Sequence, residues 1–209
     1  MPPVGVTVLD HPLARHLLTT LRDERTAPEQ FRQSARTLAT LLLLRATEDL
    51  ATAPRDVRTP MGAHTGETMT EPIAAIPVLR AGLALLEPVL DLFADVAVGY
   101  VGLERDETTA VARAYYANLP KLSGRLTLVL DPMLATGGSA GQTMTMLKAQ
   151  GATRIRMVCV VAAPEGVTRL RSEHPDVEIV TAAVDEGLDP RSYIVPGLGD
   201  FGDRLFGTG

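Results

Sequence analysis

The residues best suited to chemistry stand together between Asp131 and Ser139. Asp131 closes the apolar run 126–130, which is typical of a strand buried on both faces of a parallel sheet. Open α/β sheets bind ligands at the carboxyl ends of their strands, so we expect the Asp131 carboxylate to face a ligand. A carboxylate there is suited to holding sugar hydroxyls or a water molecule on Mg²⁺.

Residues 136–139, Thr-Gly-Gly-Ser, follow and lead into a helical pattern that runs to about Gln150, with Gly151 as its stop. Adjacent glycines let the backbone approach a ligand closely. The N–H groups at a helix start attract an anion, and the hydroxyls of Thr136 and Ser139 add donors. The segment therefore predicts a phosphate site. A turn with an N-cap is the local alternative; a Walker A loop is excluded because no Gly-Lys-Ser/Thr follows the glycines.

The elements that must position this stretch alternate between strands and helices. Buried strands are predicted at residues 73–79, 96–101, 126–130, 155–162 and 177–183, and helices at about 82–93, 140–150 and 165–173. This alternation predicts an α/β fold with a mostly parallel, doubly wound sheet flanked by helices. Arg80 ends strand 73–79 at the same sheet edge as Asp131. Its guanidinium suits a diphosphate, and an ordinary surface arginine is the alternative.

The segments outside this alternation are predicted from short sequence patterns of their own. Helical spacing predicts helices at 11–25 and 28–50, and His11, which precedes a proline, is expected to cap the first. Residues 54–71 are polar and predict a loop or an exposed hairpin, and 112–119 are expected to be part of a mobile hairpin. The other histidines have no motif around them and are expected at the surface: His16, His64 and His174.

The segment 131–139 resembles the phosphoribosyl-diphosphate (PRPP) loop of the type I phosphoribosyltransferases. Most of that superfamily carries two acids before the loop, whereas Asp131-Pro132 is the pattern of its uracil branch. The resemblance to this branch runs in order along almost the whole chain, with weaker agreement over 51–72. Its further matches are His11-Pro12-Leu13, Leu79-Arg80-Ala81-Gly82, Ala162-Ala163-Pro164-Glu165-Gly166 and Tyr193-Ile194-Val195-Pro196-Gly197-Leu198-Gly199-Asp200.

The resemblance implies a type I phosphoribosyltransferase-like fold with a small C-terminal hood that binds the base. It implies a Mg²⁺-dependent pentosyl transfer in which uracil and PRPP give UMP and diphosphate through an oxocarbenium-like transition state. Mg²⁺ is expected to be held mainly by PRPP and water, so no residue is assigned to it.

The resemblance also carries functional residues onto this sequence. The implied catalytic residues are Asp131, Arg105 and Arg80. The implied PRPP-binding residues are Arg80, Arg105, Asp131, Pro132, Met133, Leu134, Ala135, Thr136, Gly137, Gly138, Ser139 and Asp200. The implied uracil-binding residues are Ile194, Gly199, Asp200 and Phe201, which read the base mainly through the main chain.

Two positions depart from the family pattern. Glu104 stands where Tyr usually precedes the PRPP-binding arginine, and a carboxylate there weakens diphosphate binding unless it points away or holds Mg²⁺. Phe201 stands where relatives usually have a small residue. Its ring would shrink the base pocket or stack on the base if it pointed inward, which keeps a modified pyrimidine open as the substrate.

Composition sets the outer bounds. The chain has 209 residues, 45% hydrophobic and 22% charged, which predicts one globular domain. We expect it to comprise a helical layer at about 11–50, an arm or hairpin at 54–71, a core at 73–184 and a base-binding tail at 185–209. A net charge of −5 argues against nucleic-acid binding. The lone Cys159 in a core strand, with neither a signal peptide nor a membrane-spanning run, predicts a cytoplasmic protein.

Two other functions remain open from the sequence. One is the same fold acting on a modified pyrimidine or another base. The other is a non-enzymatic PRPP sensor that regulates through RNA or a partner protein. The family precedent and the apolar N-terminal helices lead us to expect a homodimer or a larger homo-oligomer, and some relatives are activated by GTP.

Overall fold

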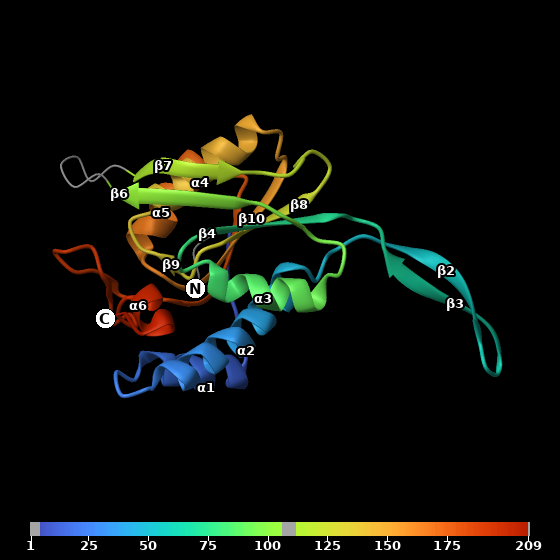
Figure 1. The fold of residues 1–209 in the computed structure, drawn as a ribbon, viewed down its shortest axis with the longest axis horizontal. Coiled ribbons are helices and arrows are strands. Elements are labelled where there is room, and N and C mark those ends of the chain that lie inside the picture. The colour runs from blue at the N-terminus through green and yellow to red at the C-terminus, as the bar shows by residue number, and fades with distance from the viewer. Residues whose placement is uncertain (1–4, 106–111, 209) are drawn as a thin grey trace.

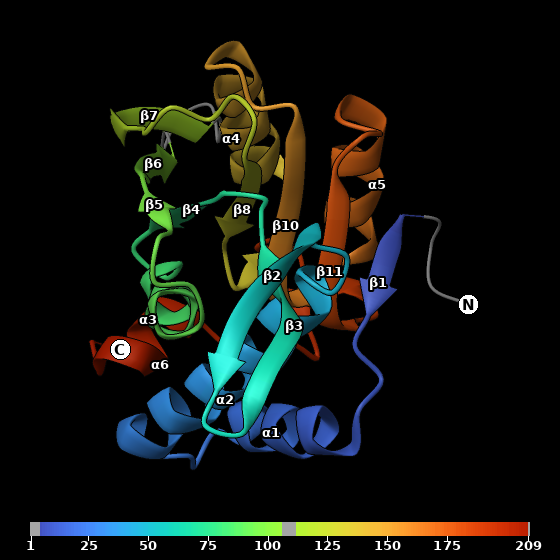
Figure 2. The ribbon, with the colours of Figure 1, turned by 90° about the vertical axis from the view of Figure 1, so that its right-hand side faces the viewer.

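The computed structural model describes residues 5–105 and 112–208. Figure 1 shows the fold, and at its centre strands lie side by side in the order β1, β11, β10, β8, β4, β6, β7, which can be followed by their labels in Figure 2. Their bounds are β1 Val6–Val8, β11 Glu178–Val184, β10 Arg154–Ala162, β8 Leu126–Leu130, β4 Ile73–Leu79, β6 Tyr100–Arg105 and β7 Ala112–Asn118, with β5 (Ala97–Val98) beside β4 and β9 (Met133–Leu134) beside β10. The pairs are parallel except for β6 with β7. The predicted mostly parallel sheet is confirmed.

Helices cover both faces of this sheet (Figure 2). One face packs against α1 (Pro12–Arg22), α2 (Pro28–Ala46) and α3 (Leu83–Leu92), and the other against α4 (Gly138–Ala149) and α5 (Pro164–Glu173). Strand β8 is buried throughout, and its side chains alternate between the two faces. Leu128 and Leu130 join the first cluster and Val129 the second. Within the described residues, no helix is both long and apolar enough to span a bilayer.

Two segments extend beyond the sheet and its helices. Strands β2 (Thr52–Thr59) and β3 (Gly62–Met69) form an antiparallel hairpin that projects from the body (Figure 1). This confirms the hairpin alternative. The tail pairs β12 (Gly187–Leu188) with β13 (Ile194–Val195) and then forms α6 (Phe201–Phe206). The sequence analysis assigned no secondary structure to this glycine-rich tail.

The predicted cap of the first N-terminal helix is confirmed, but the predicted end of the second is not. His11 caps α1, since its Nδ1 accepts a hydrogen bond from Leu13 N–H at 3.1 Å, which confirms the expected structural role. The prediction that the second helix reaches Leu50 is wrong, because α2 ends at Ala46. The chain then turns, with the Leu50 N–H donating to the Thr47 carbonyl at 3.2 Å, and this turn carries Asp49 toward the sheet.

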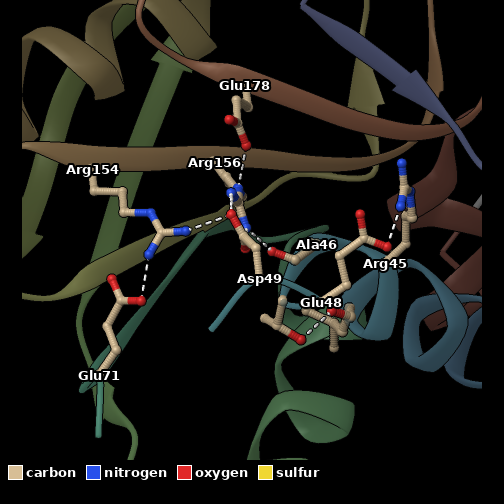
Figure 3. A network of polar contacts seen from close by, with 10 residues as sticks. Arg45, Ala46, Glu48, Asp49, Glu71, Arg154, Arg156 and Glu178 are labelled. Atoms are coloured by element: carbon tan, nitrogen blue, oxygen red, sulfur yellow. Dashed lines mark hydrogen bonds and ion pairs between the residues drawn. The ribbon is translucent and has the colours of Figure 1, made fainter. Parts of the chain in front are cut away.

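A network of ion pairs ties that turn to the amino-terminal end of the sheet (Figure 3). The Arg156 guanidinium, whose side chain is 7% exposed, donates to both carboxylate oxygens of Asp49 at 2.6 Å and to the buried Ala46 carbonyl at 2.6 Å. It also pairs with Glu178 at the start of β11. Arg156 holds the pKa of Asp49 well below its usual range. The network therefore fixes the end of α2 against β10 and β11.

Replacing Arg156 with Met should destabilise the protein, because the Ala46 carbonyl would lose a buried partner and three ionic hydrogen bonds would go. We expect a loss of roughly 2–3 kcal/mol and a Tm lower by roughly 5–10 °C at this chain length. The matched control is Arg45→Met, which removes an exposed pair with Glu48 and should change stability by no more than about 0.5 kcal/mol. Equal thermal melting curves for the two variants would contradict a structural role for the network.

Candidate active site

Asp131 follows the last residue of β8, at the carboxyl-terminal end of the sheet. Its main-chain N–H donates to the Val158 carbonyl at 3.2 Å, and its Oδ1 accepts from the Met133 N–H at 3.3 Å. Within the described residues, the second carboxylate oxygen has no hydrogen-bond partner. Burial raises the pKa of Asp131 to about 6, and the Met133 N–H offsets part of that rise. The carboxyl group is therefore partly protonated just below neutral pH.

The segment after Asp131 leads into the start of helix α4. Gly137 has the left-handed φ of +76°, and a β-carbon on it would lie 2.9 Å from the Gly166 carbonyl oxygen, so glycine is required there. The N-cap residue Gly137 has no side chain to cap α4, and the Gly138 N–H donates to Thr136 Oγ1 at 3.4 Å. Within the described residues, the N–H groups of Ser139 and Ala140 have no hydrogen-bond acceptor. Such N–H groups at the positive end of a helix dipole form an anion site.

Helix α5 supports this helix start from the side. A β-carbon on Gly166, in its first turn, would overlap the Ala135 carbonyl oxygen, so the two segments touch through backbone. At its other end, His174 Nε2 lies 3.0 Å from the Gly141 carbonyl oxygen and 3.3 Å from Thr145 Oγ1. The prediction that His174 is a surface residue is wrong, because the ring is buried between α4 and α5.

Residues 79–82 lie directly beside the end of β8. Gly82 has no room for a side chain, since a β-carbon would overlap the Leu130 carbonyl oxygen and lie 2.6 Å from the Val78 nitrogen. The peptide bond between Leu79 and Arg80 is cis. The Arg80 side chain is 66% exposed, with Nη2 3.9 Å from Asp203 Oδ1. The Arg80 guanidinium is thus an exposed positive charge at the same end of the sheet as Asp131.

Arg105 is the last residue of β6, which runs parallel to β4 with Gly102 opposite Leu79. The backbone of Arg105 therefore lies three residues beyond the end of β4, on the side where Arg80 follows. The side chains of Glu104 and Arg105 lie outside the described part of the structure. Their roles stay predictions.

The tail brings a third segment to this end of the sheet. Asp200 caps α6, with Oδ1 accepting from the Asp203 N–H at 2.9 Å. A β-carbon on Gly202 would lie 4.0 Å from the Ala81 β-carbon, so α6 meets the loop that follows β4. Gly199 is exposed, with φ +79°, and neither its N–H nor its C=O forms a hydrogen bond within the described residues. It offers a paired donor and acceptor to a ligand.

The Phe201 ring points away from that exposed backbone. It is 1% exposed and packs edge-to-face on Phe31 of α2, with ring centroids 5.1 Å apart and an interplanar angle of 67°. The ring therefore anchors the tail to the helical layer. Ile194 is buried as well, which leaves only its main chain to meet a ligand.

Three predicted segments are thus gathered at one end of the sheet: the loop from Asp131 to Ser139, the turn 80–82, and the tail at 199–203. Together they offer an anion site, a guanidinium, a carboxylate of raised pKa and an exposed peptide group. No three His, Cys, Asp or Glu side chains of the described residues converge as metal ligands. The donors fit an Mg²⁺ ion that keeps most of its ligands from a polyanionic substrate and water.

The sequence analysis missed Asp185 and Arg204, which hold the tail in place. Asp185 follows the apolar strand β11 much as Asp131 follows β8, and that parallel was a usable signal. Arg204 has no comparable signal, because the carbonyl groups it binds include two in the first helix and the turn after it.

Comparisons with known proteins agree with this geometry. A family model described as "Uracil phosphoribosyltransferase" matches residues 8–208. The uracil phosphoribosyltransferase of Dictyoglomus thermophilum is 46% identical over 205 residues, which cover 97% of this chain and 99% of that protein. The structure of the AQ2163 protein from Aquifex aeolicus superposes with a TM-score of 0.91 at 37% identity, covering 96% of this chain and 97% of the other.

A more distant structure supports the fold alone. The hypoxanthine phosphoribosyltransferase of Trypanosoma cruzi, solved with the product IMP, has a TM-score of 0.51 at 14% identity, covering 75% of each chain. The sheet and its flanking helices are thus those of the type I phosphoribosyltransferases. From the family match and the near-complete coverage at 46% identity, the chain belongs to the uracil phosphoribosyltransferase family.

Proposed function

We propose that this protein is a Mg²⁺-dependent uracil phosphoribosyltransferase, which joins N1 of uracil to C1′ of PRPP and releases diphosphate to give UMP. The observation that carries the proposal is the start of α4, where the N–H groups of Ser139 and Ala140 have no acceptor within the described residues, a few residues after the half-buried Asp131. The choice of uracil as the base rests on the name of relatives such as the Dictyoglomus thermophilum protein, which align along 97% of this chain.

In this proposal the 5′-phosphate of PRPP is bound by residues 136–139 through main-chain N–H groups and the hydroxyls of Thr136 and Ser139. Arg80 and Arg105 contact the diphosphate, whose charge grows as it leaves. The ionised Asp131 holds the ribose hydroxyls and stabilises positive charge on the ribose ring. Mg²⁺, when bound, neutralises charge on the leaving diphosphate. The chemistry needs positioning and electrostatics, with no covalent nucleophile.

The base is read by the main chain of the tail. Uracil presents N–H donors beside carbonyl acceptors, and the N–H and C=O of Gly199, which have no partner among the described residues, complement such a pair. The main chains of Ile194 and Phe201 flank it, and Asp200 lies beside the loop that follows β4. Because the Phe201 ring is packed on Phe31, this departure from the family pattern does not narrow the pocket.

Further expectations rest on the family resemblance. We propose that residues 1–209 act as one phosphoribosyltransferase domain in the cytoplasm, without binding nucleic acid. The protruding β2–β3 hairpin, whose tip residue Met61 is 95% exposed, is consistent with a homodimer or larger assembly. GTP activation stays a prediction, which an activity assay with and without GTP decides.

Diphosphate release with PRPP and Mg²⁺ tests the main proposal. We expect release only when uracil is present, with UMP as product, and loss of release when EDTA removes the metal. Cytosine, thymine, 5-substituted uracils and hypoxanthine should be poor substrates. Release with another base and not with uracil would assign a sister activity. PRPP binding without release with any base would indicate a sensor.

Asp131→Asn should lower kcat by roughly 10²–10³-fold, the usual effect of removing one charge-stabilising group. In the wild type kcat/KM should rise with pH through about 6, where Asp131 ionises, and this limb should disappear in the variant. The same ionisation destabilises the ligand-free fold as pH rises from about 4 through about 6, because burial disfavours the charged carboxylate. Above pH 6 the variant should therefore melt a few degrees higher than the wild type.

Asp10→Asn, which alters an exposed carboxylate paired with Arg15, is the control for the Asp131 variant and should leave both profiles unchanged. Unaltered turnover in Asp131→Asn would remove Asp131 from the mechanism.

Phe201→Ala should weaken the tail without changing base preference, because the ring contacts Phe31 and not the base. Replacing a core Phe with Ala costs about 3–5 kcal/mol of stability, so Tm should fall. KM for uracil should rise because the tail is held less firmly. Phe206→Ala, on the same helix but 45% exposed, is the control and should change Tm little. A broader base range at unchanged Tm would show instead that the ring lines the pocket.

A further inference from the structure

Asp185 is a buried carboxylate with an unusual set of partners. Its side chain is 4% exposed, and it accepts two hydrogen bonds from Arg22, at 2.8 Å on Oδ2 and 2.5 Å on Oδ1. Oδ2 also accepts the N–H of Gly197 at 2.9 Å. Its own N–H donates to the Ala162 carbonyl at 2.8 Å, which fixes Asp185 to the end of β10. Arg22 is thus linked through Asp185 to the tail.

Two arginines approach the same stretch of tail through its carbonyl groups. Arg22 Nη1 donates to the Gly197 carbonyl at 2.6 Å, and Arg204 Nη1 donates to the Leu198 carbonyl at 2.8 Å. Arg204 also donates to the carbonyls of Leu21 and Asp23 at the end of α1, the latter at 2.6 Å. Its guanidinium carbon lies 4.5 Å from the centroid of the Phe31 ring. Arg204 therefore joins the tail to the end of α1.

These contacts use the polar backbone groups on one side of the tail. The N–H and C=O of Gly197 and the C=O of Leu198 are all bound by charged side chains, whereas Gly199 keeps both of its groups free within the described residues. Gly197 itself cannot carry a side chain, because a β-carbon would overlap the Ile194 carbonyl oxygen. The orientation of the Gly199 peptide is thus set by the two residues before it.

We propose that Arg22, Asp185 and Arg204 form a positioning clamp that sets base affinity by holding residues 197–199 in the conformation that presents Gly199 to the base. The inference rests on the proposed function, which places the base at Gly199. None of the three side chains is assigned a contact with substrate. Buried ion pairs add little net stability compared with apolar packing, but they fix geometry. A peptide group that must meet two hydrogen-bonding atoms of a planar base needs such fixing.

The test compares Asp185→Asn and Arg22→Lys with Arg15→Lys, an exposed arginine on the same helix that pairs only with Asp10 among the described residues. Both clamp variants keep side-chain size, and Arg22→Lys keeps the charge while losing the two-pronged contact. We expect KM for uracil to rise about tenfold or more, as for a lost charged hydrogen bond, with KM for PRPP within about twofold. Arg15→Lys should match the wild type.

Hydrogen–deuterium exchange of the ligand-free proteins supplies a readout independent of activity. In the clamp variants we expect faster exchange across residues 194–201 and unchanged exchange across 126–139. Unchanged exchange at 194–201 would overturn the clamp, and faster exchange with unaltered KM for uracil would overturn its role in base binding. If the wild type releases no diphosphate with any base, the proposed function fails, and with it the role in base binding, while exchange still decides whether the clamp holds the tail.

Discussion

The contact on which the candidate site depends is the approach of Gly82 to the end of β8. A side chain at this position would overlap the Leu130 carbonyl, so only glycine lets the turn after β4 lie against the last residue before Asp131. Two neighbouring parallel strands, each buried, thereby place their following loops in contact. Arg80 and Asp131 follow neighbouring strands at the same end of the sheet, where the backbone at Gly82 can touch the backbone at Leu130.

Charge is distributed unequally between the two ends of this sheet. At the amino-terminal end, Arg156 and Arg154 are paired with carboxylates, and the network holds α2 to the strands. At the carboxyl-terminal end, within the part of the chain that the structure describes, Asp131 accepts only from the Met133 main-chain N–H, and the N–H groups of Ser139 and Ala140 have no acceptor. Unpaired polar groups at the carboxyl-terminal end are costly in a fold without ligand.

The sequence predicted those parts of the candidate site whose signals lie in consecutive residues. The apolar run 126–130, its terminal acid and the glycine pair were enough to place β8, the loop and α4. The tail was harder, because its glycines suggest an irregular segment, and the residues that hold α6 in place, Phe201 and Leu205, pack on a core cluster formed by distant parts of the chain, α2 among them. His174 was misplaced because its burial comes from α4, about thirty positions earlier in the chain. Pairings over such separations leave no local pattern.

The same reasoning explains why the beginning and the end of the chain must meet. A site that reads a base by main-chain groups gains little from side-chain chemistry, so its selectivity depends on how well a short backbone segment holds one conformation. Glycines supply the left-handed angles that Gly197 and Gly199 require, and they also remove the side chains that would restrict motion. Order must then come from elsewhere in the chain. Here α1 and α2, which lie between β1 and the rest of the sheet in the sequence, supply it through Arg22, Phe31 and the carbonyl groups that bind Arg204.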